Sequence, residues 1–378
     1  MLLPAMSQEG GSRVERAPGV VRGEWWRRRD DGRLQCELCP RYCRLHEGQR
    51  AFCYVRQARD GEIVLASYSR VSGFCIKPIE KKPLNHFHPG LAVLSFGTAG
   101  CNLGCRFCQN WDMSKAREDD VLSSAAAPAM VAEAAVNGGC DTMAFTYNDP
   151  IIFAEYAIDC AVAAHERDVR TVAVTSGYIT PEARPPFFRH IDAANVDMKA
   201  FTDDFYRSVC FAELGPVLDT IRWLTNETEV WAELTTLLIP GHNDSEDEVA
   251  RLCDWVAEEA GPEVPLYFTA LHPGFKLTDA PPTPPDTLRR ARRQGLGAGL
   301  RHVYTGNIHD PEGQSTSCVG CGCSVIARDR YQIKAWALDE SGHCTVCGMA
   351  LDGHVQGQPG TWGGRRQRVS VGGRPGPA

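Results

Sequence analysis

The sequence predicts an α/β fold built from repeated strand–helix units, a complete or partial (β/α) barrel with a small cysteine-rich module on either side of it in the chain. Three observations support this prediction. From residue 91 onward, near-continuous apolar runs such as 91–96 alternate with helical segments, as in a parallel sheet covered on both faces. Cysteine clusters with metal-type spacing flank that region. The chain has 378 residues, 43% of them hydrophobic, which is enough for one substantial core.

The composition narrows the class of protein. A net charge of −7 gives no electrostatic case for binding nucleic acid or an anionic membrane. The 17 cysteines are odd in number and clustered, which indicates thiolate ligands in a reducing compartment rather than a disulfide framework. No apolar run reaches the length of a membrane span, and residues 1–10 lack the apolar core of a secretory signal. These features predict a cytoplasmic protein without membrane contact.

Changes in composition along the chain divide it into six segments. The core is flanked by two short metal modules, and both ends of the chain are rich in Gly, Arg and Pro, which predicts disorder there. The segments are a disordered arm (1–34), a Cys-rich metal knuckle (35–60), a connecting segment (61–90), the (β/α) barrel (91–308), a zinc-ribbon-like module (309–352) and a disordered tail (353–378).

The first knuckle contains four thiols within eighteen residues, at Cys36, Cys39, Cys43 and Cys53. So short a piece has little core of its own, so a bound metal is expected to hold it together. The ligand set is complete at four, which suits a structural zinc or a second iron–sulfur cluster that relays electrons. His46 could replace one ligand, and four unmetallated thiols are the alternative without a metal.

Strand and helix patterns then alternate along the chain. Expected strands lie at 62–68, 91–96, 142–147, 171–175, 194–200, 230–239, 266–271 and 302–304. Expected helices lie at 125–137, 151–166, 181–190, 203–209, 216–226, 245–260 and 286–295.

Polar residues follow six of these strands. In a (β/α) barrel the carboxyl ends of the strands share one rim, where such folds place their chemistry. A single turn residue or helix cap would explain each position alone, but six in phase indicate a site. The segments are the cysteine loop after 91–96, then 146–150, 175–178, 197–199, 239–244 and 272–276.

The cysteine loop places Cys101, Cys105 and Cys108 directly after the strand at 91–96. Three thiolates suit one soft metal centre, and a set of three leaves a coordination position open for a substrate or cofactor. The alternative is a structural zinc with Cys75 or Cys140 as a distant fourth ligand, although zinc sites usually draw ligands as Cys-x2-Cys pairs.

The Cys-x3-Cys-x2-Cys loop, with Phe107 before its third cysteine, resembles the cluster loop of radical S-adenosylmethionine (radical SAM) enzymes. Together with 85–90, 109–114, 147–153, 238–241 and 303–307, it is similar to the radical SAM enzyme of the AmmeMemoRadiSam system, a relative of the pyruvate formate-lyase activating enzymes. The resemblance covers about residues 36 to 350 and implies a barrel of the radical SAM type.

The resemblance also implies cofactors and site residues. The three loop cysteines would hold a [4Fe-4S] cluster whose open iron chelates SAM, and an electron from the cluster would split SAM to a 5'-deoxyadenosyl radical. Phe107 would lie against the adenine. The remaining SAM contacts it implies are Asn148 and Asp149, in place of the superfamily's Gly-Gly-Glu motif, then Ser176, Asp197, Lys199 and His272. A carboxylate can pair with the ammonium of SAM, a lysine ammonium with its carboxylate, and a hydroxyl or imidazole with its ribose. An Asp–Lys pair in a barrel could also be purely structural.

The C-terminal module contains two Cys-x2-Cys pairs, Cys318 with Cys321 and Cys344 with Cys347, around a strand-like segment at 331–338. This spacing predicts a structural zinc. Cys323 is a spare thiol that could compete for the metal. Such a ribbon could bind a partner or cap the barrel.

The first functional hypothesis is an oxidoreductase of the radical SAM type that abstracts a hydrogen atom from an unknown substrate. A glycyl-radical enzyme activase, which would dock a protein substrate, is the narrower alternative. A zinc-binding scaffold protein is the alternative outside enzymes. The resemblance implies as partners a small electron donor such as flavodoxin or ferredoxin, and companion proteins that are Memo-like and AMMECR1-like.

Overall fold

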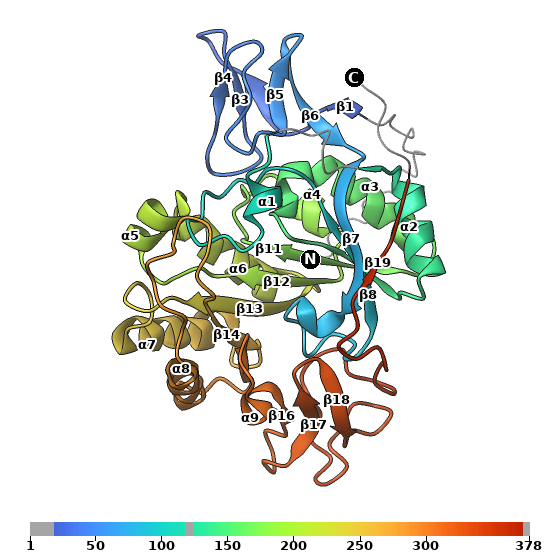
Figure 1. The fold of residues 1–378 in the computed structure, drawn as a ribbon, viewed down its shortest axis with the longest axis vertical. Coiled ribbons are helices and arrows are strands. Elements are labelled where there is room, and N and C mark those ends of the chain that lie inside the picture. The colour runs from blue at the N-terminus through green and yellow to red at the C-terminus, as the bar shows by residue number, and fades with distance from the viewer. Residues whose placement is uncertain (1–18, 118–123, 373–378) are drawn as a thin grey trace, which may run out of the picture.

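The computed structural model describes residues 19–117 and 124–372. A large mixed sheet lies at the centre, with a small β module at each end of the long axis (Figure 1). The N-terminal module contains β3 (Leu34–Cys36), β4 (Arg44–Leu45) and β5 (Arg56–Arg59). The C-terminal module contains β16 (Thr316–Ser317), β17 (Ser324–Asp329) and β18 (Gln332–Trp336).

Seven neighbouring strands of the central sheet run parallel. All residues of the first, second and sixth of them are buried, which explains the continuous apolar runs in the sequence. The strands are β8 (Ala92–Gly97), β10 (Thr142–Phe145), β11 (Arg170–Thr175), β12 (Ala193–Asp197), β13 (Trp231–Leu238), β14 (Leu266–Ala270) and β15 (Val303–Gly306).

Among the described residues the sheet stays open, so the structure has a partial barrel and not a closed one. Its order begins at β15, passes through the parallel strands to β8, and continues to the antiparallel β7 (Arg70–Pro78) and β19 (Gln367–Arg368). The two-residue β9 (Ser124–Ala125) also pairs with β7.

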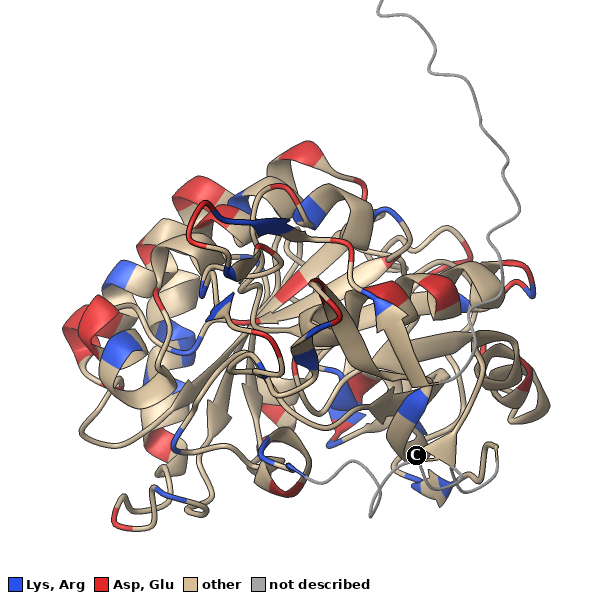
Figure 2. Cartoon of the chain, turned by 90° about the horizontal axis from the view of Figure 1, so that it is seen from above, with Lys and Arg blue, Asp and Glu red and all other residues tan. Residues whose placement is uncertain are grey.

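Helices follow most of the parallel strands and lie along the outside of the sheet, with acidic and basic residues interspersed on them (Figure 2). Their starts follow ordinary capping rules: Ser245 accepts a hydrogen bond from the Glu248 amide at the start of α7, and proline stands in the first turn of α2, α6 and α8. They are α2 (Pro128–Asn137), α3 (Ala154–His165), α4 (Arg184–Phe188), α5 (Asp203–Phe205), α6 (Gly215–Glu227), α7 (Glu246–Trp255) and α8 (Pro285–Gly297), with α5 and α7 extended by the π-helical η3 (Tyr206–Cys210) and η4 (Val256–Ala260). Short elements elsewhere are η1 (Ile79–Lys81), α1 (Trp111–Ser114), η2 (Pro150–Phe153) and α9 (Pro311–Gln314).

The predicted disordered arm is wrong for residues 19–34, whereas residues 1–18 lie outside the described part. β1 (Gly19–Arg22) pairs with β6 (Glu62–Tyr68), and β2 (Trp26–Arg28) pairs with β3 (Leu34–Cys36). Such edge strands are held by backbone hydrogen bonds to partners elsewhere, which the polar composition of the segment does not reveal.

The knuckle also extends past its predicted boundary at residue 60. β5 (Arg56–Arg59) and β6 form one hairpin whose two turn residues, Asp60 and Gly61, have φ of 52° and 76°. A second short strand, β4 (Arg44–Leu45), pairs with β3. The N-terminal module is therefore two small sheets, one of which reaches to Tyr68.

A buried ion pair fastens this module to the barrel. Arg56 on β5 and Glu155 on α3 have side-chain exposures of 1% and 0%, and the guanidinium donates two hydrogen bonds to the carboxylate, at 2.7 Å and 2.5 Å. Arg56 Nε also donates to the Ile152 carbonyl at 3.0 Å, and Glu155 Oε1 accepts from the Glu24 amide at 2.8 Å. Both charges are thus fully paired inside the protein.

The C-terminal tail is ordered through residue 372, so the prediction of disorder from residue 353 is wrong over that range. β19 pairs with β7 and lies beside it in Figure 1, and the Gly360 amide donates to the Pro89 carbonyl at 2.8 Å. Gly90 has φ of 80°, and a methyl group there would overlap the carbonyl of Gly360. The glycines that lowered the sequence complexity are what lets the two backbones approach.

The C-terminal module is a three-stranded antiparallel sheet with a small core of its own. It consists of β16 (Thr316–Ser317), β17 (Ser324–Asp329) and β18 (Gln332–Trp336), and its core includes Val325 and Ile326. Among the described residues, no helix is long and apolar enough to cross a membrane.

Candidate functional site

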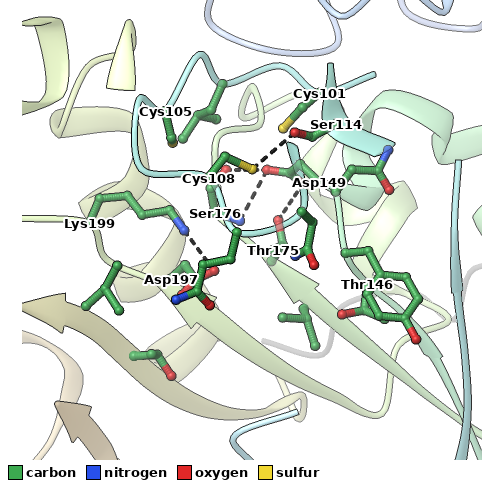
Figure 3. A pocket seen from close by; sticks show the side chains of 18 of the residues that line it. Cys101, Cys105, Cys108, Ser114, Thr146, Asp149, Thr175, Ser176, Asp197 and Lys199 are labelled. Carbon is green, nitrogen blue, oxygen red and sulfur yellow. Dashed lines mark hydrogen bonds and ion pairs between the residues drawn. The ribbon is translucent and has the colours of Figure 1, made fainter. Parts of the chain in front are cut away.

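A cavity of about 290 Å³ lies at the carboxyl ends of the parallel strands. Figure 3 shows the cysteine loop along one wall and polar residues that follow β10, β11 and β12 on the facing wall. Of the residues predicted to hold the cluster and SAM, all except His272 line this cavity. They are Cys101, Cys105, Phe107, Cys108, Asn148, Asp149, Ser176, Asp197 and Lys199.

Backbone contacts determine the path of the cysteine loop. Gly100 has φ of 85°, and a side chain there would overlap the carbonyl of Cys53 in the N-terminal module. At the middle of the loop, a methyl group on Gly104 would lie 2.8 Å from the ring of Phe211. Lys115 Nζ donates to the Leu103 carbonyl at 2.7 Å. The loop is therefore confined on both sides, which fixes its path along the cavity wall.

The three thiols have different surroundings. Cys108 Sγ lies 3.1 Å from the hydroxyl of Ser114. Burial raises the pKa of Cys101 to about 12, while a hydrogen bond from Cys210 is the largest cause that lowers the pKa of Cys105 to about 7. Cys210 does not line the cavity, and no sequence motif marks it because it is an isolated cysteine. Three sulfur donors on one cavity wall fit an iron–sulfur cluster with an open position.

Asn148 and Asp149 line the cavity, yet their side chains already have protein partners. Asn148 Nδ2 donates to the Gly100 carbonyl at 2.8 Å, which holds the start of the cysteine loop. The Asp149 carboxylate accepts hydrogen bonds from the Ser176 hydroxyl, from the Thr175 hydroxyl at 2.8 Å and from the Ile151 amide at 3.2 Å. Burial raises the pKa of Asp149 despite these donors. Both residues therefore position the walls of the cavity.

Asp197 and Lys199 form an ion pair at the end of β12, with 2.8 Å between Lys199 Nζ and Asp197 Oδ2 (Figure 3). Burial lowers the pKa of Lys199, but the Asp197 carboxylate outweighs burial, and the pKa lies above its ordinary value. The backbone of Lys199 is anchored by Asn243 Nδ2, which donates to its carbonyl at 2.8 Å, and by Tyr206 Oη, which accepts from its amide at 3.0 Å. The pair presents a fixed positive and a fixed negative group to the cavity.

Phe107 is buried against Phe205, with 5.9 Å between ring centroids, and its side chain lines the cavity beside the cysteines. His272 instead lines a second cavity, described below. The strand-end pattern predicted a common rim for all six segments, but the turn at 272–276 carries His272 away from the cysteines.

Several lining residues were not predicted as site residues. Ser114 comes from α1, Thr146 and Tyr147 from the end of β10, and Asn307 from the end of β15. Tyr147 has φ of 75°, and its hydroxyl accepts a hydrogen bond from Lys77 at 3.0 Å. A left-handed conformation at a bulky residue is uncommon and often marks a functional site, but it cannot be recognised from sequence alone.

The N-terminal knuckle brings Cys36, Cys39, Cys43 and Cys53 close enough to affect one another's pKa. Burial is the largest cause, and it raises the pKa of Cys36 to about 12. The knuckle packs on the cysteine loop, where the Arg41 guanidinium donates to the carbonyls of Asn102 and Phe211. Four sulfur donors on so small a module suit a metal, and the donor set does not choose between zinc and iron.

The C-terminal module gathers Cys318, Cys321, Cys344 and Cys347, whose Sγ atoms all lie within 4.8 Å of one another. This geometry fits a tetrahedral metal site and agrees with the predicted Cys-x2-Cys pairs. The fifth thiol, Cys323, has its Sγ 3.3 Å from that of Cys321 and 3.4 Å from that of Cys344. It therefore stands beside the four-sulfur site without completing it.

Replacing Cys318 by alanine is expected to remove one metal ion per chain and to unfold the C-terminal module, since a module with so small a core depends on its metal. Metal analysis and limited proteolysis of residues 309–352 measure this. Cys323→Ala is the matched control and is expected to keep the metal. Equal metal content in Cys318→Ala and the unaltered protein would refute the four-sulfur assignment.

Comparisons with known proteins identify relatives of this chain. Residues 96–253 match the family model described as the Radical SAM superfamily. Over 324 residues the chain is 39% identical to "Uncharacterized protein MJ0808" of Methanocaldococcus jannaschii, a match that covers 85% of this chain and 96% of that protein.

Two solved structures show weaker overall similarity. A domain of pyruvate-formate lyase-activating enzyme from Bacteroides vulgatus ATCC 8482 has a TM-score of 0.38 at 16% identity and covers 43% of this chain and 98% of that one. A radical SAM methyltransferase from Sphaerobacter thermophilus has a TM-score of 0.47 at 15% identity and covers 76% of this chain and 77% of that one.

Proposed function

We propose that this chain, whose residues 96–253 belong to the radical SAM superfamily, is an enzyme that cleaves SAM reductively to abstract a hydrogen atom from its substrate. In this proposal Cys101, Cys105 and Cys108 hold a [4Fe-4S] cluster. When bound, the cluster and SAM supply a one-electron reductive cleavage that generates a 5'-deoxyadenosyl radical. The observation that carries the proposal is the single cavity that three loop thiols share with a charged pair and polar strand ends.

The protein's own residues would bind and orient SAM and would exclude water from the cavity. The Lys199 ammonium suits the carboxylate of the SAM methionine group, and the Asp197 carboxylate suits its ammonium. Phe107 offers an apolar face for the adenine, and the Ser176 hydroxyl suits the ribose. Asn148 and Asp149 keep the loop and the end of β11 in place through the hydrogen bonds described above. The buried strands around the cavity keep water away from a reactive intermediate.

The electron would come from a small donor such as flavodoxin or ferredoxin. Arg106 belongs to the cysteine loop, and Lys276 lies beside it, because the Lys276 amide donates to the Arg106 carbonyl at 3.0 Å. Both side chains are exposed and would offer positive charge to an acidic donor. The knuckle would serve as a structural zinc site, or as a second cluster on the path of the electron.

The finer assignment to the AmmeMemoRadiSam system, with Memo-like and AMMECR1-like companions, remains a proposal. It rests on the sequence motifs that carry the resemblance, such as residues 85–90 and 303–307. Activation of a glycyl-radical enzyme is the narrower alternative, and a cytoplasmic location is part of the same proposal.

The test is a turnover experiment under anaerobic conditions. Protein purified without oxygen and supplied with iron and sulfide is expected to be brown, to bleach with dithionite, and to convert SAM to 5'-deoxyadenosine and methionine. Heat-treated protein is the control. A colourless protein that contains zinc alone and forms no 5'-deoxyadenosine would overturn the proposal in favour of a zinc-binding scaffold.

A further inference from the structure

A second cavity, of about 410 Å³, adjoins the cysteine-lined one. Pro83, Thr269 and Asn307 line both cavities, so the two spaces meet across a common wall at the carboxyl ends of β14 and β15. The far wall of the second cavity comes from β17 and the turn that follows it, in the C-terminal module. This cavity is therefore a chamber between the barrel and the ribbon, next to the proposed site of SAM cleavage.

The charges that line the second cavity are mostly positive. Lys81, Arg328 and Arg330 contribute three cations, and Glu80 is the one carboxylate among the described lining residues. Burial raises the pKa of Glu80. His309 lines the cavity as well, but it lies 3.4 Å from Asp329 and is already engaged.

The cations are held in place from different parts of the fold. Arg328 is 2% exposed; its Nη1 donates to the Thr316 hydroxyl at 2.7 Å, and its Nη2 donates to the Asn85 carbonyl at 2.8 Å. Lys81 Nζ lies 4.7 Å from the ring centroid of Tyr331, in a cation–π contact. Arg330, which has φ of 55°, sits exposed in the turn between β17 and β18.

Two buried polar atoms of this wall have no hydrogen-bond partner among the described residues, Arg328 Nε and Glu80 Oε2. Unpaired buried polar atoms call for a water, ion or ligand nearby. Positive charge in excess of negative charge, in a cavity that adjoins the first one, fits an oxyanion as that ligand.

We propose that the second cavity is the substrate site and that Lys81, Arg328 and Arg330 bind an oxyanion group, a phosphate or a carboxylate, of a small organic substrate. The rest of the substrate would extend past Thr269 and Asn307 into the first cavity. The identification of the ligand as a substrate rests on the proposed function. The oxyanion site itself can be tested without turnover.

The test is calorimetric titration of the anaerobically purified holoprotein with inorganic phosphate, and separately with acetate, in the presence of saturating SAM. One phosphate or one acetate per chain is expected to bind. Binding of phosphate alone identifies a phosphorylated substrate, and binding of acetate alone identifies a carboxylate substrate. If neither anion binds, or if an anion binds only when SAM is left out, the ligand does not occupy the second cavity and the proposal fails.

Charge-neutral variants locate the site. Arg330→Gln and Lys81→Gln are each expected to lower the affinity for the anion by about tenfold or more, the loss typical of one charge-assisted hydrogen bond. Arg293→Gln is the matched control, because Arg293 is exposed on α8 and lines neither cavity. Unchanged affinity in both test variants would overturn the proposal. Arg330 is exposed, so this variant is expected to fold, and retained metal in the ribbon verifies that.

The outcomes separate this inference from the proposed function. A protein that binds the anion but does not cleave SAM refutes the radical SAM reaction and leaves the anion site standing. A protein that cleaves SAM but binds neither anion, or binds one without sensitivity to Arg330→Gln and Lys81→Gln, refutes the substrate site alone.

Discussion

Replacing Cys101 by alanine is expected to reduce 5'-deoxyadenosine formation to the level of a reaction without protein. The reason is the small ligand set, because the two thiols that remain cannot hold a cluster that needs three protein ligands. Without the cluster, no electron reaches SAM. Iron analysis and chromatography of the SAM products measure the effect. The zinc expected in the C-terminal module should be unchanged, because its four sulfurs lie in a separate module.

Cys75→Ala and Cys140→Ala are the matched controls for this variant. Each is a buried cysteine outside the cavity, and each is the fourth ligand that a structural zinc at the loop would need. Cys140 lies just before β10, at the amino ends of the parallel strands, whereas the cysteine loop lies at their carboxyl ends. Both controls are expected to keep activity. Activity that survives in Cys101→Ala would refute the ligand assignment, and loss of the loop's metal in either control would favour the zinc alternative.

Glu155→Gln is expected to lower the free energy of unfolding by about 3–5 kcal/mol, the usual cost of leaving a buried charge without its partner. Arg56 would remain buried with its positive charge intact and a neutral amide in place of the carboxylate. Urea unfolding followed by circular dichroism measures the loss. Because Arg56 belongs to the N-terminal module, protease cleavage in residues 19–68 should also become faster.

Two further variants define the cause of that loss. Arg251→Gln breaks an exposed pair with Asp247, whose side chains are 51% and 84% exposed, and should change stability by less than about 1 kcal/mol. Replacing both Arg56 and Glu155 by methionine should recover much of the loss, since apolar residues of similar volume leave no unpaired charge. A Glu155→Gln protein that unfolds at the same urea concentration as the unaltered one would contradict this account.

The core of the fold was predictable because its strands are buried on both faces. In such strands most residues are apolar, as in Ala92–Gly97 and Leu266–Ala270, so the hydrophobic runs mark them with little ambiguity. Closure of the barrel was not predictable. Whether an edge strand finds a partner depends on the curvature of the sheet, and in the described residues β15 pairs only with β14 on the parallel side.

The site was predictable where one residue type has one chemical use. Three closely spaced cysteines have few uses besides metal binding, whereas Asp197 and Lys199 were expected from the family resemblance; all five line one cavity. His272 shows the limit, since a polar residue after a strand need not point to the common cavity. Tyr147 and Cys210 were missed because a backbone conformation and a contact between distant segments leave no local pattern.

Both ends of the chain were wrongly predicted as disordered over their described parts, for one physical reason. Gly19–Arg22 and Gln367–Arg368 are ordered by backbone hydrogen bonds to strands far away in the chain. Such bonds use atoms that every residue has, so composition cannot report them.

The pairing of β7 with β19 affects how the protein is made. Gln367–Arg368 cover part of the outer edge of β7, so a chain leaving the ribosome carries that part of the edge unpaired until these two residues have been made. An exposed edge strand invites pairing with another polypeptide, and slow completion prolongs the hazard. Aggregation during translation is therefore the expected hazard of pairing two strands that lie so far apart in the chain.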